Sequence, residues 1–308
     1  MALLGNKLQM RSVGPAIGRP QSAVEIAPEG ALAASLPGGG AAPVYAFAAL
    51  RPGALSPGVG GTNVMLADAV ADALRSAIEQ VSPRSRSVTL IIPDMAVRVF
   101  MLDFDSFPAK PLEAIPVLRF RLRKAVPFDA EHAALSYQVL PQSSREPVRV
   151  LVTVMPGPVL AEYEAAVRAA GFEPGAIMPT GLAALAALNP SEGALAANLG
   201  STALTTSITS GDDLLLYRTI DLPEDNAGRV AEVQRSVAVA AAYFEDKMGS
   251  RPRQLHYAGA VPVTEFARAV SDGEFEVVEI APTPATGATT AGGPVGFAGV
   301  AGALTGVA

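Results

Sequence analysis

Residues 194–222 read ALAANLGSTALTTSITSGDDLLLYRTIDL, and this stretch decides the fold. It begins with an apolar run at Leu195–Leu199, and a turn of small residues at Gly200–Thr202 separates this run from a β-branched one. A polar turn at Ser210–Asp213 then precedes a third apolar run. Apolar and β-branched runs between turn residues are typical of strands. The stretch therefore predicts three consecutive strands joined by short turns.

The beginning of the chain shows the same order of elements between Ser22 and Leu50. A short apolar run, AVEIA, is followed by a turn rich in proline and glycine and by a second apolar run, VYAFAAL, with LPGGGAAP as a loop between the strands. This pattern predicts an opening hairpin or meander. Two halves that begin alike indicate an internal duplication, and the sequence therefore predicts two lobes.

Apolar residues at spacings of three and four predict helices between these strands. We expect helices at Leu66–Val81, around Ile115 to Leu122, and at Val159–Ala170, Gly181–Leu188, Val230–Met248 and Val263–Val270. We expect further strands on both sides of a tight turn at Pro93 and Asp94 within Val88–Phe104, and at Ala133–Leu140, Val148–Met155, Gln254–Tyr257 and Phe275–Ile280. Alternating strands and helices in two similar halves predict an α/β fold of two lobes with mixed sheets.

The composition excludes several functional classes. The 308 residues are long enough for two cores, and 50% of them are apolar and 17% charged, as in folded proteins. The net charge of −6, from 23 basic and 29 acidic residues, lacks the basic surplus of proteins that bind nucleic acid. The chain has no cysteine and only two histidines, which excludes a Cys/His metal site and a cysteine nucleophile.

The apolar runs of the chain are short. The first 21 residues carry Lys7, Arg11 and Arg19 but lack the continuous apolar core of a signal peptide. The longest runs, near Leu182–Leu188 and Val295–Ala308, fall short of the roughly 20 residues that span a bilayer. We therefore expect a cytoplasmic protein with no transmembrane segment of its own.

A strand followed by a turn of small residues, with Asp at the strand end, is the phosphate-binding layout of actin-like and sugar-kinase-like ATPases. In the first half, the corresponding stretch is VEIAPEGALAA, with Glu25 at the acidic position and Ala27, Pro28 and Glu29 in the turn. Pro28 has no amide to donate, and Glu29 would repel a phosphate group. We therefore expect this turn to bind phosphate poorly.

The second half keeps more of that layout. Gly200, Ser201 and Thr202 form the small turn, whereas Asn198 stands where the ATPases have Asp. Asn brings no charge to magnesium and cannot act as a general base. Gly259 follows a late strand, where such folds use glycine to approach the adenosine. Ordinary turns are the alternative for both features. The sequence thus predicts at most a weak ATP site, without hydrolysis.

Other candidates for catalysis or metal binding are weak. Asp103 and Asp105 lie two residues apart near a strand end, a pattern typical of a solvated turn. His132 and His256 have no partner at ligand spacing and are expected to be surface or packing residues. The sequence contains neither a G-x-x-x-x-G-K-[ST] loop nor a G-x-S-x-G elbow. Nothing in it requires an enzyme, and we expect none.

Two further segments admit more than one interpretation. Arg119, Arg121, Arg123 and Lys124 lie largely off the apolar side of their helix, which indicates a solvated face or a contact for an acidic partner or membrane headgroups. The C-terminal GPVGFAGVAGALTGVA, residues 293–308, has the small residues of a packed helix and no Lys or Arg to meet headgroups. We expect it to form a helix packed near the nucleotide cleft.

Four features stand in order along the middle of the chain: K-x-(I/V)-P-F at the end of a helix, Y-x-V on the next strand, A-G-(F/L)-x-P after a later helix, and an Arg on the strand after the polar turn. Their residues here are Lys124, Pro127, Phe128, Tyr137, Val139, Gly171, Phe172, Pro174 and Arg218. In this order and spacing, the sequence from about 88 to 222 resembles the PilM family of type IV pilus proteins.

The resemblance implies a two-lobed actin-like fold, a duplicated ribonuclease H-like fold shared with FtsA proteins and with the cytoplasmic part of the type II secretion protein GspL. It implies a flexible segment at 1–20, a first lobe at 21–190 with an inserted subdomain at about 105–155, and a second lobe at 191–308. The family motifs I-D-I-G-(S/T) and D-(I/L)-G appear here as V-E-I-A-P and N-L-G. The ATP site that the family implies is therefore expected to be degenerate.

For function, the resemblance implies a cytoplasmic scaffold held at the inner membrane through its partners. These partners are the cytoplasmic tail of a PilN-like inner-membrane protein, bound in a groove near the inserted subdomain, and other components of the pilus machine. An actin-like ATPase or nucleotide-switched scaffold, and a GspL-like component of type II secretion, are the alternatives.

Overall fold

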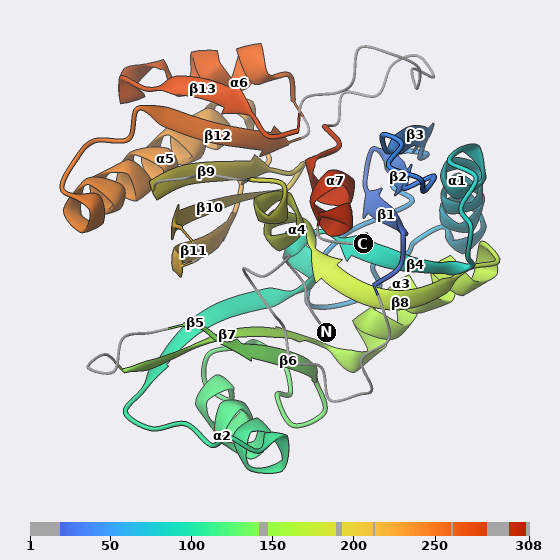
Figure 1. The fold of residues 1–308 in the computed structure, drawn as a ribbon, viewed down its shortest axis with the longest axis horizontal. Helices are drawn as coiled ribbons and strands as arrows, with labels where there is room; N and C mark the ends of the chain where they lie inside the picture. Colours follow the sequence, from blue (N-terminus) through green and yellow to red (C-terminus); the bar gives the residue numbers. More distant parts are fainter. Residues whose placement is uncertain are drawn as a thin grey trace.

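Three β-sheets organise the chain (Figure 1). The computed structural model describes residues 19–141, 147–188, 193–211, 213–259, 261–281 and 296–305. Two sheets have five strands each and belong to the two lobes, and the third has three strands and lies beside them. The predicted α/β fold of two lobes with mixed sheets is confirmed.

The first lobe contains a sheet with the strand order β3-β2-β1-β4-β8. Its strands are β1 (Ser22–Ala27), β2 (Gly30–Ser35), β3 (Val44–Ala49), β4 (Ser87–Ile92) and β8 (Glu173–Pro179). The first three form an antiparallel meander, whereas β4 runs parallel to β1 and β8 runs parallel to β4. The sequence predicted an opening hairpin or meander, and a meander is present, with β2 as a further strand between the two predicted runs.

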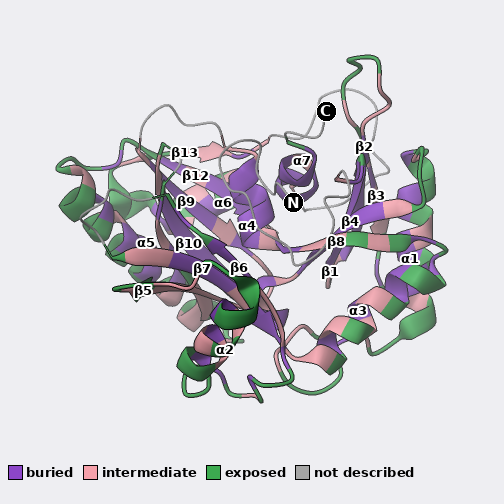
Figure 2. Cartoon of the chain, turned by 60° about the horizontal axis from the view of Figure 1, so that its bottom comes forward, coloured by how far each residue is buried: buried purple, intermediate pink, exposed green. Residues whose placement is uncertain are grey.

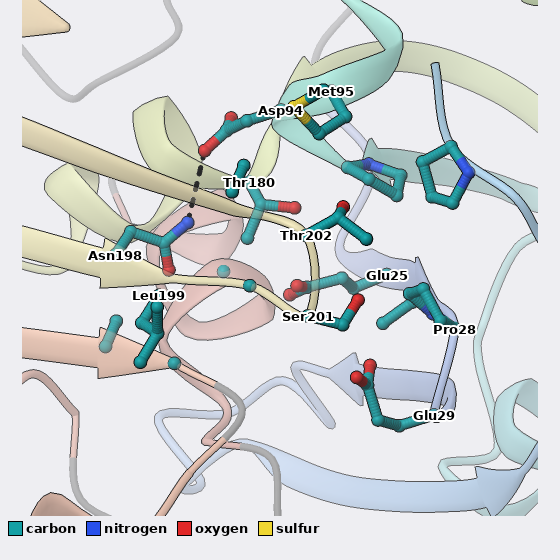
Figure 3. A pocket seen from close by; sticks show the side chains of 18 of the residues that line it. Glu25, Pro28, Glu29, Asp94, Met95, Thr180, Asn198, Leu199, Ser201 and Thr202 are labelled. Carbon is teal, nitrogen blue, oxygen red and sulfur yellow. Dashed lines mark hydrogen bonds between the residues drawn. The ribbon is translucent and has the colours of Figure 1, made fainter. Parts of the chain in front are cut away.

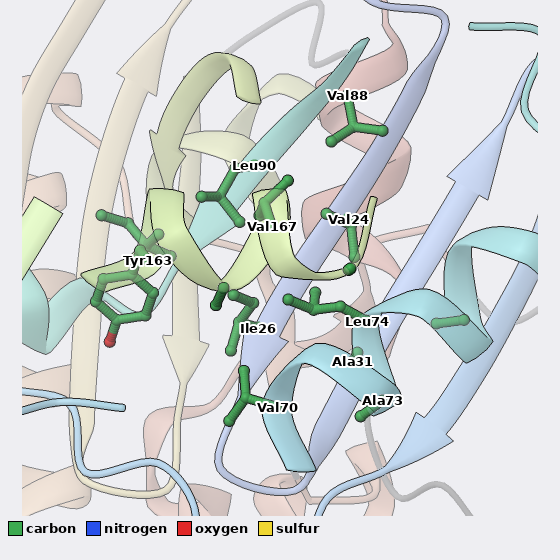
Figure 4. Packing of buried hydrophobic residues seen from close by; sticks show 14 of the residues in the cluster. Val24, Ile26, Ala31, Val70, Ala73, Leu74, Val88, Leu90, Tyr163 and Val167 are labelled. Carbon is green, nitrogen blue, oxygen red and sulfur yellow. The ribbon is translucent and has the colours of Figure 1, made fainter. Parts of the chain in front are cut away.

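Two helices cover one face of this sheet, α1 (Ala67–Gln80) and α3 (Gly157–Ala169). Figure 4 shows Leu74 of α1 and Tyr163 of α3 packed against Val24 and Leu90 of the sheet, and all four side chains are buried. Successive residues of a strand point to opposite faces, so Ala23 belongs to a different core from Val24.

The second lobe repeats this topology. Its sheet has the order β11-β10-β9-β12-β13, with an antiparallel meander followed by two parallel strands. The strands are β9 (Gly193–Leu199), β10 (Ala203–Ser210), β11 (Asp213–Asp221), β12 (Gln254–Gly259) and β13 (Glu276–Glu279), and the helices are α5 (Asn226–Met248), α6 (Val263–Ala269) and the single turn η2 (Ser271–Gly273). Both sheets thus share one order of strands, as the duplicated sequence pattern indicated.

The third sheet, with the order β5-β7-β6, lies between β4 and α3 in the chain. Its elements are β5 (Arg98–Phe104), α2 (Pro111–Leu122), β6 (Ala134–Val139) and β7 (Val148–Met155). They enclose a separate small core that includes Leu118 of α2 and Val152 of β7. Figure 1 shows this unit as a projection at one end of the molecule, with α2 on its outer side.

Three features of the first lobe differ from the sequence prediction. The stretch that forms β2, GALAAS, was not predicted as a strand because alanine and glycine are poor strand formers, but pairing on both edges and full burial override that propensity. Strand β8, EPGAIMP, was missed because its prolines and glycine indicate a loop. Strands β4 and β5 flank a short 3₁₀ turn, η1 (Asp94–Ala96), but belong to different sheets and do not pair with each other.

The centre of the molecule is filled by two short helices, α4 (Thr180–Ala186) and α7 (Ala298–Leu304), which lie between the two large sheets (Figure 1). Together with both sheets they form one buried cluster, to which Ile91 of the first lobe and Ala258 of the second contribute. Arg19 holds the end of α7 by donating to the carbonyl oxygens of Ala303 (2.6 Å) and Thr305 (3.0 Å).

Gly302 is the point of closest approach between α7 and α4. A Cβ atom there would overlap the carbonyl oxygen of Ala183 and come within 2.9 Å of the Ala187 amide nitrogen. Both obstacles are backbone atoms and cannot rotate away. In an unobstructed helix, Ala in place of Gly stabilises by about 1 kcal/mol.

We therefore predict the opposite sign for Gly302→Ala, a loss of about 2 kcal/mol or more in the free energy of unfolding, measured by urea titration. Gly60→Ala is the matched control, because no atom lies within 4 Å of a Cβ there. A gain in stability for Gly302→Ala would contradict the close packing of α7 on α4.

Candidate functional site

A pocket lies where the strand ends of the two lobes face each other (Figure 3). The first lobe contributes Glu25, Ile26, Ala27, Pro28, Glu29, Pro57, Pro93, Asp94, Met95 and Thr180, the second contributes Asn198, Leu199, Gly200, Ser201, Thr202, Ala203, Ala258 and Gly259, and the C-terminal segment contributes Gly296, Ala298 and Gly299. The four residues that the sequence suggested for a weak ATP site, Gly200, Ser201, Thr202 and Gly259, are thus brought together in this pocket.

The first-lobe wall of the pocket is acidic. Ala27 pairs with Gly30, so that Pro28 and Glu29 form a two-residue hairpin turn with only one backbone N–H between them. Glu25, Glu29 and Asp94 all line the pocket, and the described residues that line it include no Lys or Arg. Like charges at this range repel each other, and a triphosphate would meet carboxyl groups without a compensating cation from the lining.

Glu25 lies at the end of β1 and is buried. Its Oε2 atom has no hydrogen-bond partner among the described residues. Burial, and secondarily the negative charge of Asp94, raises the pKa of Glu25 from 4.5 to about 8. The side chain is therefore mostly protonated at neutral pH and brings little charge to a magnesium ion.

Asp94 joins the two lobes. It follows β4 in the first lobe and accepts hydrogen bonds from the second lobe, from Asn198 Nδ2 (3.2 Å), Thr205 Oγ1 (2.7 Å) and Tyr217 OH (3.3 Å). The amide of Gly181 donates to the same carboxylate at 2.9 Å. Burial raises the pKa of Asp94, and these four donors oppose that rise.

This arrangement gives Asn198 a structural explanation. Its side chain donates to Asp94 across the lobes (Figure 3, dashed line). An Asp at position 198, as in the ATPases, would place a second carboxylate about 3 Å from that of Asp94, where like charges repel strongly. The amide that weakens the site for magnesium is therefore the group that makes this contact between the lobes favourable.

The turn at Gly200–Thr202 is held from behind by α5. Arg229 donates to the carbonyl oxygen of Gly200 at 2.8 Å and to that of Ser201. The carbonyl oxygen of Thr202 accepts from the Leu222 amide at 2.9 Å. In the described part of the chain, no hydrogen bond engages the amides of Ser201 and Thr202. The turn that the sequence singled out is thus a fixed part of the pocket wall.

The glycines of the pocket have different roles. A Cβ at Gly259 would lie 2.6 Å from the carbonyl oxygen of Leu199 and 2.6 Å from the hydroxyl oxygen of Tyr257, so packing of β12 against β9 is enough to explain this glycine. A Cβ at Gly200 would meet only the carbonyl oxygen of Ala203, at 3.6 Å, which is ordinary contact. Gly200 therefore tolerates a side chain, whereas Gly259 does not.

The N-terminal turn of α7 closes the pocket next to Glu25. Ala298 and Gly299 line it, and a Cβ at Gly299 would overlap Oε2 of Glu25. The prediction that the small-residue C-terminal segment packs near the nucleotide cleft is confirmed for Ala298–Leu304. The rest of residues 293–308 lies outside the described residues, apart from Gly296, Phe297 and Thr305.

The remaining candidate residues have ordinary partners. Asp103 pairs with Arg149 (3.2 Å), and Asp105 is exposed. His132 pairs with Asp129 at the surface (2.6 Å), and burial lowers the pKa of His256 on β12. Among the described residues, no group of three or more His, Cys, Asp or Glu is arranged to hold a metal ion.

Comparison with known proteins identifies the fold of this chain. No protein-family model and no curated protein matches the chain. A solved PilM-PilN type IV pilus biogenesis complex matches with a TM-score of 0.69 and 19% identity, over 96% of this chain and 100% of the other. A Bacteroides thetaiotaomicron protein of unknown function with an actin-like ATPase fold matches with a TM-score of 0.52 and 11% identity, over 85% and 91%.

The cytoplasmic domain of EpsL, an inner-membrane component of type II secretion in Vibrio cholerae, matches at a TM-score of 0.48 and 13% identity, over 78% of this chain and 82% of that domain. Within the described residues, every helix is too short or too polar to span a bilayer. On the first two matches together with the duplicated sheet topology, this chain has the actin-like fold and is similar in structure to PilM.

Proposed function

We propose that this chain is an actin-like scaffold of a type IV pilus machine, located at the cytoplasmic side of the inner membrane, where it binds the short cytoplasmic tail of a PilN-like protein. The observation that carries the proposal is the cleft, in which Asn198, at the position where the ATPases have Asp, donates a hydrogen bond to Asp94 of the other lobe. A protein whose lobes are fixed in this way works through contacts with partners rather than through turnover.

The structural likeness supports the choice of machine. The PilM-PilN complex covers nearly the whole chain, including the small three-stranded unit, and PilM in that structure is bound to PilN. We propose a first lobe at 21–190, an inserted subdomain near 105–155 and a second lobe at 191–308. The tail of the partner would lie in a groove near the subdomain, and other pilus components would bind elsewhere on the two lobes.

Calorimetric titration with a tail peptide tests this proposal. The peptide is the N-terminal cytoplasmic segment of a PilN-like protein encoded next to this chain, and a scrambled peptide of the same composition is the control. The account predicts saturable binding of one peptide per chain and none of the scrambled peptide. Equal heats from the two peptides would rule out the function as a pilus adaptor.

A nucleotide-switched scaffold is the second candidate, because the unengaged amides of Ser201 and Thr202 line the pocket. Gly200→Asp is the discriminating variant, because a side chain fits there and its charge would face a phosphate. Hydrolysis of ATP by the natural chain that disappears in Gly200→Asp would favour this candidate. A GspL-like component of type II secretion would have the same fold but a different partner. The same titration with the tail peptide of that partner distinguishes this role from the pilus role.

A further inference from the structure

We infer that the outer face of α2 is a contact site for an anionic lipid surface. One face of the helix, with Ala114, Leu118 and Leu122, is buried on the three-stranded sheet. On the opposite side, Leu112 is 88% exposed and Phe120 is 70% exposed. This inference goes beyond the proposed function, because it requires neither a nucleotide nor a protein partner.

The exposed apolar residues form a continuous stripe. Leu112, Pro116 and Phe120 are spaced by four residues, which places them one above another on a helix. Figure 2 shows exposed surface along α2, which lies on the outside of the three-stranded unit. A helix that is apolar on two faces normally buries both. The fold covers only one face of α2 and leaves the second available.

The segment that contains this stripe is rich in basic residues. Between residues 110 and 124 the chain has five basic residues and one acidic residue, Glu113, whereas the whole chain has a net charge of −6. Lys110, Arg121, Arg123 and Lys124 are all exposed. Nearby carboxylates balance part of this charge, since Glu113 lies 3.8 Å from Lys110 and Glu131 pairs with Arg123 at 2.6 Å.

Not every cation in this segment is available. Arg119 is turned toward its own subdomain, where it donates to the carbonyl oxygens of Ala130 and, at 3.1 Å, Ala133. The guanidinium of Arg123 lies 6.0 Å from the centre of the Phe120 ring and so remains beside the apolar stripe. Arg123 therefore lies beside the stripe, with Glu131 balancing part of its charge, and Lys110 and Lys124 lie at the two ends of the helix. Basic residues next to an apolar face are the pattern of helices that lie in a membrane interface.

A lipid surface fits this face better than a protein does. A stable protein interface uses about 20 to 30 residues on each side. The stripe offers two large apolar side chains on a convex helix, too few for such an interface. Lys and Arg beside Leu and Phe suit a bilayer, because headgroups of anionic lipids attract the cations while the apolar side chains enter the acyl boundary.

Sedimentation with lipid vesicles tests the inference on the full chain. Vesicles of phosphatidylcholine containing phosphatidylglycerol should bind the protein at low salt, and pure phosphatidylcholine vesicles should bind it weakly. Leu112→Ser with Phe120→Ser should lower the partition coefficient about tenfold, because the buried apolar area is lost. Lys110→Gln with Lys124→Gln should also lower it about tenfold, but only on anionic vesicles.

Two controls make the result specific. Val239→Ser removes an apolar side chain of α5 that is 50% exposed, and it should leave vesicle binding unchanged. The α2 variants should unfold at the same urea concentration as the natural chain, because they change exposed side chains. The absence of binding to anionic vesicles, or equal binding by the Leu112→Ser, Phe120→Ser variant, would overturn the inference.

Analytical ultracentrifugation identifies a competing occupant. If the natural chain self-associates and the Leu112→Ser, Phe120→Ser variant does not, while neither binds vesicles, the stripe is an interface between copies and the lipid inference is wrong. Saturable binding of an acidic peptide that the same variant loses, without vesicle binding, would likewise assign the face to a protein partner.

Discussion

Replacing Asp94 by Ala is expected to lower the free energy of unfolding by about 3 to 4 kcal/mol, one of the two largest effects that we predict. The buried carboxylate accepts from four donors, including Thr205 at 2.7 Å and Tyr217 at 3.3 Å, and of these Thr205 also lies 2.8 Å from the Thr219 hydroxyl. Removing the acceptor of several buried donors costs more than losing one neutral hydrogen bond. Urea denaturation at pH 7, followed by far-UV circular dichroism, measures the change.

Single-donor variants test whether Asp94 acts as the common acceptor. Thr205→Val and Tyr217→Phe should each cost about 1 kcal/mol. In the background of Asp94→Ala, both should cost much less, because their shared partner is gone. Additive losses in this double-mutant cycle would show that Asp94 does not join the lobes through these side chains.

Replacing Glu25 by Gln is expected to stabilise the protein by about 2 to 4 kcal/mol at pH 8. The pKa of Glu25 is about 8 in the folded protein against 4.5 for an unperturbed Glu, so the folded state favours the protonated form. Each tenfold change in the acid dissociation constant corresponds to about 1.4 kcal/mol, and water that enters the pocket will reduce the total. Gln keeps the size of the side chain without a charge.

The pH dependence has a defined sign. A raised folded-state pKa means that the folded protein binds more protons than the unfolded chain between pH 4.5 and 8, so the stability from Glu25 is fully present below pH 4.5 and is lost as the pH rises to 8. The natural chain and Glu25→Gln should therefore unfold alike at pH 5 and diverge toward pH 8. Parallel curves would contradict the raised pKa of the buried Glu25.

Much of the fold could be predicted from periodicity. Helix α1 was expected at Leu66–Val81 and spans Ala67–Gln80, because its apolar residues recur every three or four positions. The second-lobe meander was also expected, since β-branched runs between turns are unambiguous. Strands β2 and β8 could not be predicted, because their Ala, Gly and Pro residues carry no strand signal and only pairing with neighbouring strands holds them extended.

The site was predictable only in part. Local sequence patterns predicted the turn at Gly200–Thr202 and singled out Asn198. They did not single out Asp94, because its importance depends on donors about 90 to 120 positions away in the chain. The available signal was a Pro-Asp pair after the apolar run of β4, which was interpreted as a tight turn. No local sequence pattern indicates which donors the fold brings to a carboxylate. The contact between the lobes at Asp94 could therefore not be predicted from the sequence.

Titration of the full chain with magnesium-ATP, followed by calorimetry, tests the central claim most directly. In the cleft, Asp94 and Asn198 join the lobes, Glu29 repels phosphate, and the Pro28 turn lacks an amide to bind it. The account predicts no heat of binding at millimolar ATP from a chain that still binds the PilN-like tail peptide. Tight binding of ATP would contradict the account and would make the protein a nucleotide-switched scaffold.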